Sequence, residues 1–150
     1  MNHAPSTSTE PSRSRIRAAV VGLALAAVLM AGGCSSSSDN DADRAVRVVA
    51  PAAARELLDD GTGRVLIDVR TPEEFDEAHL DGALLIDFYR DDFETAVSEL
   101  DRNQPYVIYC RSGSRSGQAR ELMAELGFTD VADIDGGILA WESEGLPTVK

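Results

Sequence analysis

Residues 105–127 read Pro-Tyr-Val-Ile-Tyr-Cys-Arg-Ser-Gly-Ser-Arg-Ser-Gly-Gln-Ala-Arg-Glu-Leu-Met-Ala-Glu-Leu-Gly, and this stretch decides the fold. The residues from Pro105 to Tyr109 include β-branched and aromatic side chains, which predict a buried strand. Residues 117–126 favour a helix, which ends at Gly127. Cys110 therefore lies where a strand ends, and a short polar loop leads from it into a helix.

The surroundings predicted for Cys110 favour the thiolate over the thiol. Backbone N–H groups of the loop and the N-terminal end of the helix dipole are directed at the sulfur. Arg111 and Arg115 add two positive charges, and the thiolate is the nucleophilic form of cysteine. The alternative is a small buried hydrophobic residue, but Arg, Ser and Gly neighbours make a poor apolar shell. We expect a reactive sulfur at the mouth of a tight cationic loop.

The length of this loop distinguishes between two kinds of cysteine chemistry. Phosphatases of the tyrosine-phosphatase kind place an arginine after five intervening residues. In this chain four residues separate Cys110 from Arg115, and Ser116 takes the sixth place after the cysteine. Because a smaller loop suits a smaller anion or a persulfide, an arsenate or phosphate-ester enzyme is disfavoured.

Three segments of the chain resemble the rhodanese family of sulfurtransferase domains. The Cys-Arg-Ser-Gly-Ser-Arg-Ser loop at 110–116 resembles the active-site loop of that family. Asp-Val-Arg-Thr-Pro-Glu-Glu-Phe at 68–75, followed by His-Leu-Asp-Gly-Ala at 79–83, resembles its first signature, and Gly-Gly-Ile-Leu-Ala-Trp at 136–141 its last. The order and spacing match over about residues 46–149. The resemblance implies an α/β fold, a single rhodanese-like domain with a central five-stranded parallel sheet and helices on both faces.

The pattern of apolar segments favours the same fold class. Strands are predicted at residues 46–49, 65–69, 84–86, 106–109 and 131–134, and helices at 51–58, 93–100, 117–126 and 138–144. A further helix begins with a capping box formed by Thr71 and Glu74. Continuous apolar strands that alternate with helices are typical of a parallel sheet covered on both faces. Ligands bind beyond the carboxyl ends of such strands, where Cys110 lies.

The loop residues are the candidate ligands of an anionic substrate. The predicted substrate-binding residues are Arg111, Ser112, Gly113, Ser114, Arg115 and Ser116. Arg115, and to a lesser extent Arg111, would orient the substrate through charge-assisted hydrogen bonds. The serines would donate hydroxyl hydrogen bonds, and at least one of them is expected to cap the following helix. Gly113 is expected to let the loop turn with its amides inward.

Asp68 and Arg70 are predicted to support the loop. An acid at the end of a buried strand needs a partner. If the second and fourth strands are neighbours, as the resemblance implies, Asp68 could bind loop N–H groups, Ser112 or an arginine. Arg70 is expected to pair with Glu74 one helical turn away. The resemblance implies a structural rather than a catalytic role for His79, and Trp141 is expected in the core.

Composition limits the partners and cofactors. The length of 150 residues suggests one domain. After Cys34 the chain has 25 acidic and 11 basic residues, a net charge of −14. No basic face is therefore available for nucleic acid, and anionic lipid would not attract the surface. No Cys-x-x-Cys motif or Cys/His cluster is present, so we expect no metal and no other cofactor.

Residues 1–34 resemble a bacterial lipoprotein signal peptide. Three arginines between residues 13 and 17 precede an apolar run at 18–31 that is shorter than the about 20 residues of a membrane-spanning helix. Ala-Gly-Gly-Cys at 31–34 resembles the site at which Cys34 becomes lipid-modified, although a leucine is more usual where alanine stands. An uncleaved anchor helix or an ordinary signal peptide are the alternatives.

The domain organisation follows from these segments. Residues 35–44 are rich in Ser and Asp and predict a disordered tether, and residues 45–150 form the rhodanese-like domain. We expect a monomer that is lipid-anchored at the extracytoplasmic face of the cell membrane.

The resemblance implies that the chain moves sulfane sulfur from a small anionic donor such as thiosulfate to a thiol or cyanide through a persulfide on Cys110. Because Cys34 would be a lipid thioether, the acceptor must be an external molecule. The alternative is a non-catalytic binding module that keeps the rhodanese fold and recruits partners in the cell envelope.

Overall fold

The computed structural model describes residues 46–150 of the chain. The predictions for residues 1–45, which are the signal peptide, the tether and the lipidation of Cys34, lie outside the described residues. Within residues 46–150, no helix is long and apolar enough to cross a membrane. In the same part of the chain, no group of three or more His, Cys, Asp or Glu side chains could hold a metal ion.

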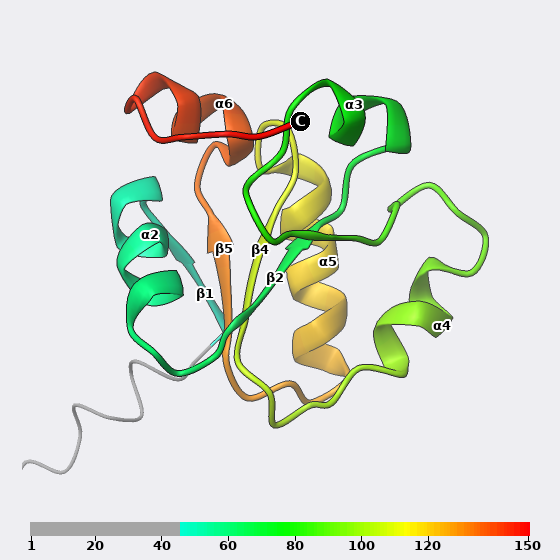
Figure 1. Ribbon diagram of the computed structural model, residues 1–150. Helices are drawn as coiled ribbons and strands as arrows, with labels where there is room; N and C mark the ends of the chain where they lie inside the picture. Colours follow the sequence, from blue (N-terminus) through cyan, green and yellow to red (C-terminus); the bar gives the residue numbers. More distant parts are fainter. Residues whose placement is uncertain (1–45) are drawn as a thin grey trace, which may run out of the picture. The chain divides into compact units, whose positions relative to one another are not determined.

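A five-stranded parallel sheet lies at the centre of residues 46–150 (Figure 1). Its strands are β1 (Val46–Val49), β2 (Val65–Asp68), β3 (Leu84–Leu85), β4 (Tyr106–Tyr109) and β5 (Val131–Ile134). The strand order is β1-β5-β4-β2-β3, and every neighbouring pair is parallel. Strand β4 is therefore central, between β5 and β2. The predicted α/β fold is confirmed.

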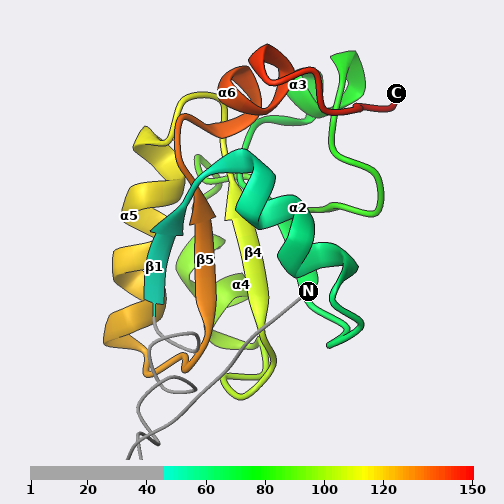
Figure 2. The ribbon, with the colours of Figure 1, turned by 90° about the vertical axis from the view of Figure 1, so that its left-hand side faces the viewer.

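Helices cover both faces of the sheet (Figure 1 and Figure 2). The helices are α2 (Pro51–Asp59), α3 (Pro72–Glu77), α4 (Phe93–Ser98), α5 (Ser114–Glu125) and α6 (Gly137–Ser143). Helices α4 and α5 pack on one face through Phe93, Ala119 and Met123, whereas α2 and α6 contribute Ala54 and Trp141 to the core of the other. The capping box predicted at the start of α3 is present.

The alternation of side chains along β4 decides which face Cys110 occupies. All four residues of β4 are buried, because both faces of the sheet are covered. Tyr106 and Ile108 belong to the core beneath α5, and Val107 and Tyr109 to the core beneath α2 and α6. Since side chains alternate with a period of two, Cys110 points to the α5 face and belongs to that core.

Helix α5 begins three residues earlier than predicted, at Ser114 rather than Gly117. Gly113 precedes it in the left-handed conformation with a φ of 93°, which glycine adopts at little cost. The chain therefore turns into the helix directly after Gly113, and the last loop residues occupy the first helical turn. None of the loop serines caps the helix, because Gly113 is the N-cap residue and makes no side-chain hydrogen bond.

A buried ion pair holds the carboxyl end of β2. Asp68 is 0% exposed and Arg70 4% exposed, and the guanidinium donates hydrogen bonds of 2.6–2.9 Å to both carboxylate oxygens. The guanidinium also donates to the carbonyl oxygen of Ala78 at 2.7 Å and lies 5.5 Å from the centre of the Tyr109 ring. The predicted pairing of Arg70 with Glu74 is therefore wrong, because Arg70 forms its ion pair with the nearer and more deeply buried carboxylate of Asp68.

We predict that Arg70→Met lowers the free energy of unfolding by about 3–5 kcal/mol, because it leaves the Asp68 carboxylate buried without its partner. The measurement is chemical denaturation at pH 7. Arg90→Met is the matched control, since the Arg90–Asp92 pair is 65% and 58% exposed and such pairs contribute little. Equal losses in the two variants would contradict the prediction.

Candidate active site

The thiol of Cys110 is buried, but its sulfur is bonded to polar groups of the loop. The residue is 1% exposed, so it does not lie at an open mouth as the sequence predicted. The backbone N–H of Gly113 donates to Sγ at 3.1 Å, and the hydroxyl of Ser116 donates to it at 3.4 Å. The sulfur therefore faces the donors of its own loop, although the residue belongs to the apolar core beneath α5.

These donors favour the ionised form of the sulfur. Burial by itself raises the pKa of the Cys110 thiol, because a charge is costly away from water. The hydroxyl of Ser116 and the backbone N–H groups of Ser116, Ser112 and Gly113 act in the opposite direction. Their sum outweighs the burial, and the pKa lies below its ordinary value. The site is thus built to hold an anionic sulfur.

The N-terminal end of α6 fixes the loop from the other side. The N–H of Ile138 donates to the carbonyl oxygen of Cys110 at 2.9 Å, and that of Leu139 to the carbonyl oxygen of Arg111 at 3.2 Å. Gly137 has a φ of 59°, and a Cβ on it would collide with the carbonyl oxygen of Cys110 and lie 2.8 Å from that of Arg111. The two backbones approach this closely only because Gly137 has no side chain.

The guanidinium of Arg115 is bound to Glu74 of α3. Two hydrogen bonds of 2.6 and 2.7 Å join the guanidinium to both carboxylate oxygens. This arginine holds the pKa of Glu74 to about 2, and Glu74 in turn raises the pKa of Arg115. The ring of Tyr89 lies 5.4 Å from the guanidinium carbon of Arg115. Arg115 is therefore a fixed cation beside the cysteine loop, and a substrate would share it with Glu74.

The structure brings together only part of the predicted site. Ser112 and Gly113 act on the sulfur through their backbone N–H groups, and Ser116 also through its hydroxyl. The side chains of Arg111, Ser112 and Ser114 belong to exposed residues. The two predicted support residues at the end of β2 bind each other beside Tyr109 and make no hydrogen bond to the cysteine loop in the described part of the chain.

Two supports of the site were missed by the sequence reasoning. The Gly136–Gly137 pair carried a signal, because adjacent glycines often mark a close approach of backbones. The pairing of Glu74 with Arg115 carried none, since 41 residues separate the two. The capping box by itself already explains a glutamate at position 74, so the sequence gives no reason to expect a second partner for it.

His79 and Trp141 have the contacts of structural residues. The His79 ring stacks on Phe75 with centroids 3.7 Å apart, and its Nδ1 lies 2.9 Å from the carbonyl oxygen of the same residue. The backbone of His79 pairs with that of Val149. Trp141 is 2% exposed, and its Nε1 donates to the carbonyl oxygen of Pro147 at 2.9 Å.

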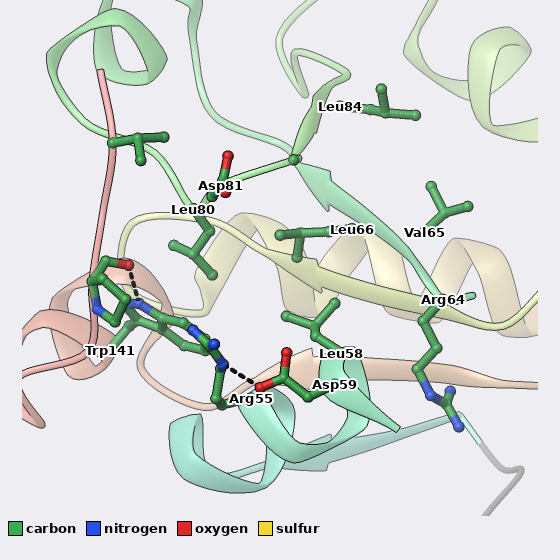
Figure 3. A pocket seen from close by; sticks show the side chains of 13 residues that line it. Arg55, Leu58, Asp59, Arg64, Val65, Leu66, Leu80, Asp81, Leu84 and Trp141 are labelled. Carbon is green, nitrogen blue, oxygen red and sulfur yellow. Dashed lines mark hydrogen bonds and ion pairs between the residues drawn. The ribbon is translucent and has the colours of Figure 1, made fainter. Parts of the chain in front are cut away.

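A separate groove of about 700 Å³ lies between α2, the β2–β3 edge of the sheet and the C-terminal segment (Figure 3). Leu58, Leu66 and Leu80 line it, and an ion pair of Arg55 with Asp59 lies at its side. No residue from 110 to 116 lines this groove. The chemistry inferred for Cys110 therefore does not depend on it.

Comparisons with known proteins agree with the geometry. Residues 50–144 match the family described as rhodanese-like domain. Thiosulfate sulfurtransferase 16, chloroplastic, of Arabidopsis thaliana is 36% identical over 110 residues, which are 67% of this chain and 90% of that protein. The crystal structure of a rhodanese-related protein from Thermoplasma volcanium superimposes with a TM-score of 0.61 at 28% identity, and covers 69% of this chain and 97% of that one.

Some relatives are much longer than this chain. The probable adenylyltransferase/sulfurtransferase MoeZ of Mycobacterium tuberculosis is 36% identical over 110 residues, which are 72% of this chain but 28% of that protein. The match to MoeZ therefore covers less than a third of its length.

We predict that Gly137→Ala lowers the free energy of unfolding by about 3 kcal/mol, since the methyl group meets the backbone of the cysteine loop. Thermal or urea denaturation measures this loss, and alkylation of Cys110 should slow in the same variant. Gly145→Ala is the matched control, because its φ is 74° but nothing lies within 4 Å of the added Cβ. Gly145→Ala should lose only about 1 kcal/mol, which is the cost of a side chain at a positive φ. Equal losses in the two variants would argue against the close approach of Gly137 to the loop.

We predict that Glu74→Gln costs about 1 kcal/mol of unfolding free energy at pH 7, a value reduced by the partial solvation of the pair. The folded-state pKa of about 2 is below the ordinary 4.5, so the contribution is present above pH 4.5 and disappears as the pH falls towards 2. Urea denaturation over this range should show the difference from wild type shrinking.

Glu73→Gln is the control for this prediction, because it removes the same charge from an exposed neighbour in the first turn of α3. Glutamine at position 74 still supplies an acceptor for the capping box, so the comparison reports on the ion pair with Arg115. A difference from wild type that stays constant down to pH 2 would disprove the assignment.

Proposed function

The chain belongs to the rhodanese-like domain family, and we propose that it is a sulfurtransferase that carries sulfane sulfur as a persulfide on Cys110. The observation that carries the proposal is the hydrogen bonding of Sγ, which accepts from Gly113 at 3.1 Å and Ser116 at 3.4 Å. A structural thiol has no need of such donors, whereas a thiolate or a persulfide anion is stabilised by them.

The first half-reaction begins with the Cys110 thiolate. It attacks the outer sulfur of a small anionic donor such as thiosulfate, so that a new S–S bond forms while the S–S bond of the donor breaks. Sulfite leaves with the electron pair of that bond, and Cys110 keeps the transferred sulfur as a persulfide. The backbone N–H groups of Ser112, Gly113 and Ser116 would stabilise the negative charge on the transferred sulfur as an oxyanion hole does.

The second half-reaction needs an acceptor from solution. Cys110 is the free cysteine of residues 46–150, and the described part of the chain offers no second thiol to resolve the persulfide. An external thiol or cyanide would attack the outer sulfur and return Cys110 as the thiolate. The two half-reactions share the enzyme but not a ternary complex, so the kinetics would be ping-pong.

Thiosulfate is the donor we favour. Residues 111–116 form a small loop whose backbone N–H groups of Ser112, Gly113 and Ser116 favour the anionic sulfur, which suits a small anion. The relative from Arabidopsis thaliana is named a thiosulfate sulfurtransferase. Arg111 is exposed beside the loop and would attract the donor's charge, while Arg115 would contribute its field from the pair with Glu74.

The cellular setting is a proposal from the sequence of residues 1–34. We infer export, lipidation of Cys34 and attachment of a monomer to the extracytoplasmic face of the cell membrane. Fractionation of cells that express the chain with Cys34→Ser tests this point, because the variant should leave the membrane fraction.

We predict that the purified full chain gains the mass of one sulfur atom when it is incubated with thiosulfate, as measured by intact mass spectrometry. Cys110→Ser should abolish the gain and lower the rate of thiocyanate formation from thiosulfate and cyanide by about 10³-fold or more. Cys34→Ser is the matched control, since it removes the other of the two cysteines and should keep the rate.

Each alternative has its own outcome in this experiment. No mass gain by the folded wild-type chain would favour the non-catalytic binding module. Hydrolysis of a simple aryl phosphate that depends on Cys110 would favour a phosphate-ester enzyme. Full thiocyanate formation by Cys110→Ser would exclude the persulfide mechanism.

A further inference from the structure

The carboxyl group of Asp133 is a buried acid that takes no part in the sulfur transfer proposed for Cys110. Asp133 lies on β5 and is 3% exposed. Its partner in register on β4 is Ile108, which precedes Cys110 by two residues. Its Oδ1 is buried without a hydrogen-bond partner among the described residues. Its Oδ2 lies 3.7 Å from a guanidinium nitrogen of Arg120, too far for a close ion pair.

Ser116 is next to the sulfur and lies four residues, about one helical turn, before Arg120, whose guanidinium is 3.7 Å from the Asp133 carboxylate. Ser116 is fully buried in the first turn of α5, and its hydroxyl is 3.4 Å from Sγ of Cys110. The same hydroxyl also acts on the carboxyl group of Asp133, whose pKa it lowers. A hydroxyl has one proton to donate. While Ser116 donates to the sulfur it cannot donate to Asp133, which agrees with the unpartnered Oδ1.

The surroundings of Asp133 make its ionisation costly. Burial raises its pKa to about 6, against the opposing effects of Ser116 and Arg120 on α5. Asp135, further along the chain, adds a like charge, and β4 and β1 present only Ile108 and Val48 in register with the acid.

Ionisation of both the thiol and the acid would place two negative charges in one buried region, with the Ser116 hydroxyl acting on both. Two acids in such an arrangement share a single charge until the pH is high.

We propose that Asp133 is a positioning residue that receives, through the hydroxyl of Ser116, the proton that Cys110 loses when its thiolate forms. The S–H bond breaks as its proton moves to the Ser116 oxygen, and the proton of that hydroxyl moves to the carboxylate, where an O–H bond forms. The resulting carboxylic acid donates to Ser116, which donates to the thiolate. The total charge of the pair stays at −1, and no further reactant is needed.

This inference deepens the proposed function, since it concerns the same thiolate. It explains how a sulfur that is 1% exposed can ionise without a second buried charge. Proton transfer between the two acids replaces proton release to water that the buried site cannot reach directly.

The test is the pH dependence of Cys110 alkylation by iodoacetamide, a neutral probe that needs no sulfur donor. In the wild-type chain we expect two inflections, separated by more than about one pH unit, because the pair loses its two protons in coupled steps. Asp133→Asn can donate to Ser116 as the carboxylic acid does but cannot exchange a proton, so a single inflection is expected.

Two further variants separate the relay from simple charge effects. Ser116→Ala keeps the acid but breaks the chain of hydrogen bonds, so the first inflection should disappear and the second move to higher pH. Asp135→Asn is the matched control, because it removes the same charge from an exposed residue two positions away; it should keep both inflections.

A single inflection in the wild-type chain, two inflections in Asp133→Asn or an unchanged profile in Ser116→Ala would each overturn the proposal. The wild-type profile alone can do so, and the test therefore does not depend on the folding of a variant. Alkylation also proceeds whether or not Cys110 accepts sulfur from thiosulfate. Failure of this inference and failure of the proposed function are thus distinguishable.

Discussion

The site depends on hydrogen bonds that the loop donates to its own cysteine sulfur. The N–H of Gly113 and the hydroxyl of Ser116 reach Sγ, and this geometry exists because the chain reverses at Gly113 with a positive φ and enters α5 at once. The carbonyl oxygens of Cys110 and Arg111 accept hydrogen bonds from N–H groups in the first turn of α6. The loop thus donates hydrogen bonds to the sulfur, while its carbonyl oxygens bind it to α6.

The groups that stabilise a negative charge on the sulfur are the Ser116 hydroxyl and the backbone N–H groups of the loop rather than arginine side chains. The chain pairs its buried or half-buried arginines with acids: Arg70 with Asp68, and Arg115 with Glu74. The first pair holds the carboxyl end of β2, and the second joins the start of α3 to the first turn of α5, so little of the arginines' charge is left free. Backbone N–H groups have the advantage that they are held in place by the fold and need no reorganisation when the sulfur becomes charged.

Burial and reactivity are reconciled by this arrangement. Cys110 lies on the face of the sheet that α5 covers, and its exclusion from water raises the cost of ionisation. The donors of the loop lower that cost, and the inferred relay to Asp133 would lower it further by keeping the pair at one charge. A thiolate formed in such a site is poorly solvated by water, so the protein rather than solvent sets its reactivity.

The sequence by itself determined the strands, the helices, the parallel sheet and the position of Cys110 beyond a strand end, because these follow from local periodicity, glycine positions and capping residues such as Thr71. It also indicated the family through three short motifs. Only the tertiary structure decided which acid each arginine meets, that Ser116 faces the sulfur rather than capping α5, and that Gly137 lies against the loop. Some of these contacts join residues far apart in the chain, 41 positions in the case of Glu74 and Arg115. Others join near neighbours, such as Arg70 with Asp68, but which neighbour is chosen depends on burial. Their choice of partner is set by the order of the strands and by burial, which no local pattern encodes.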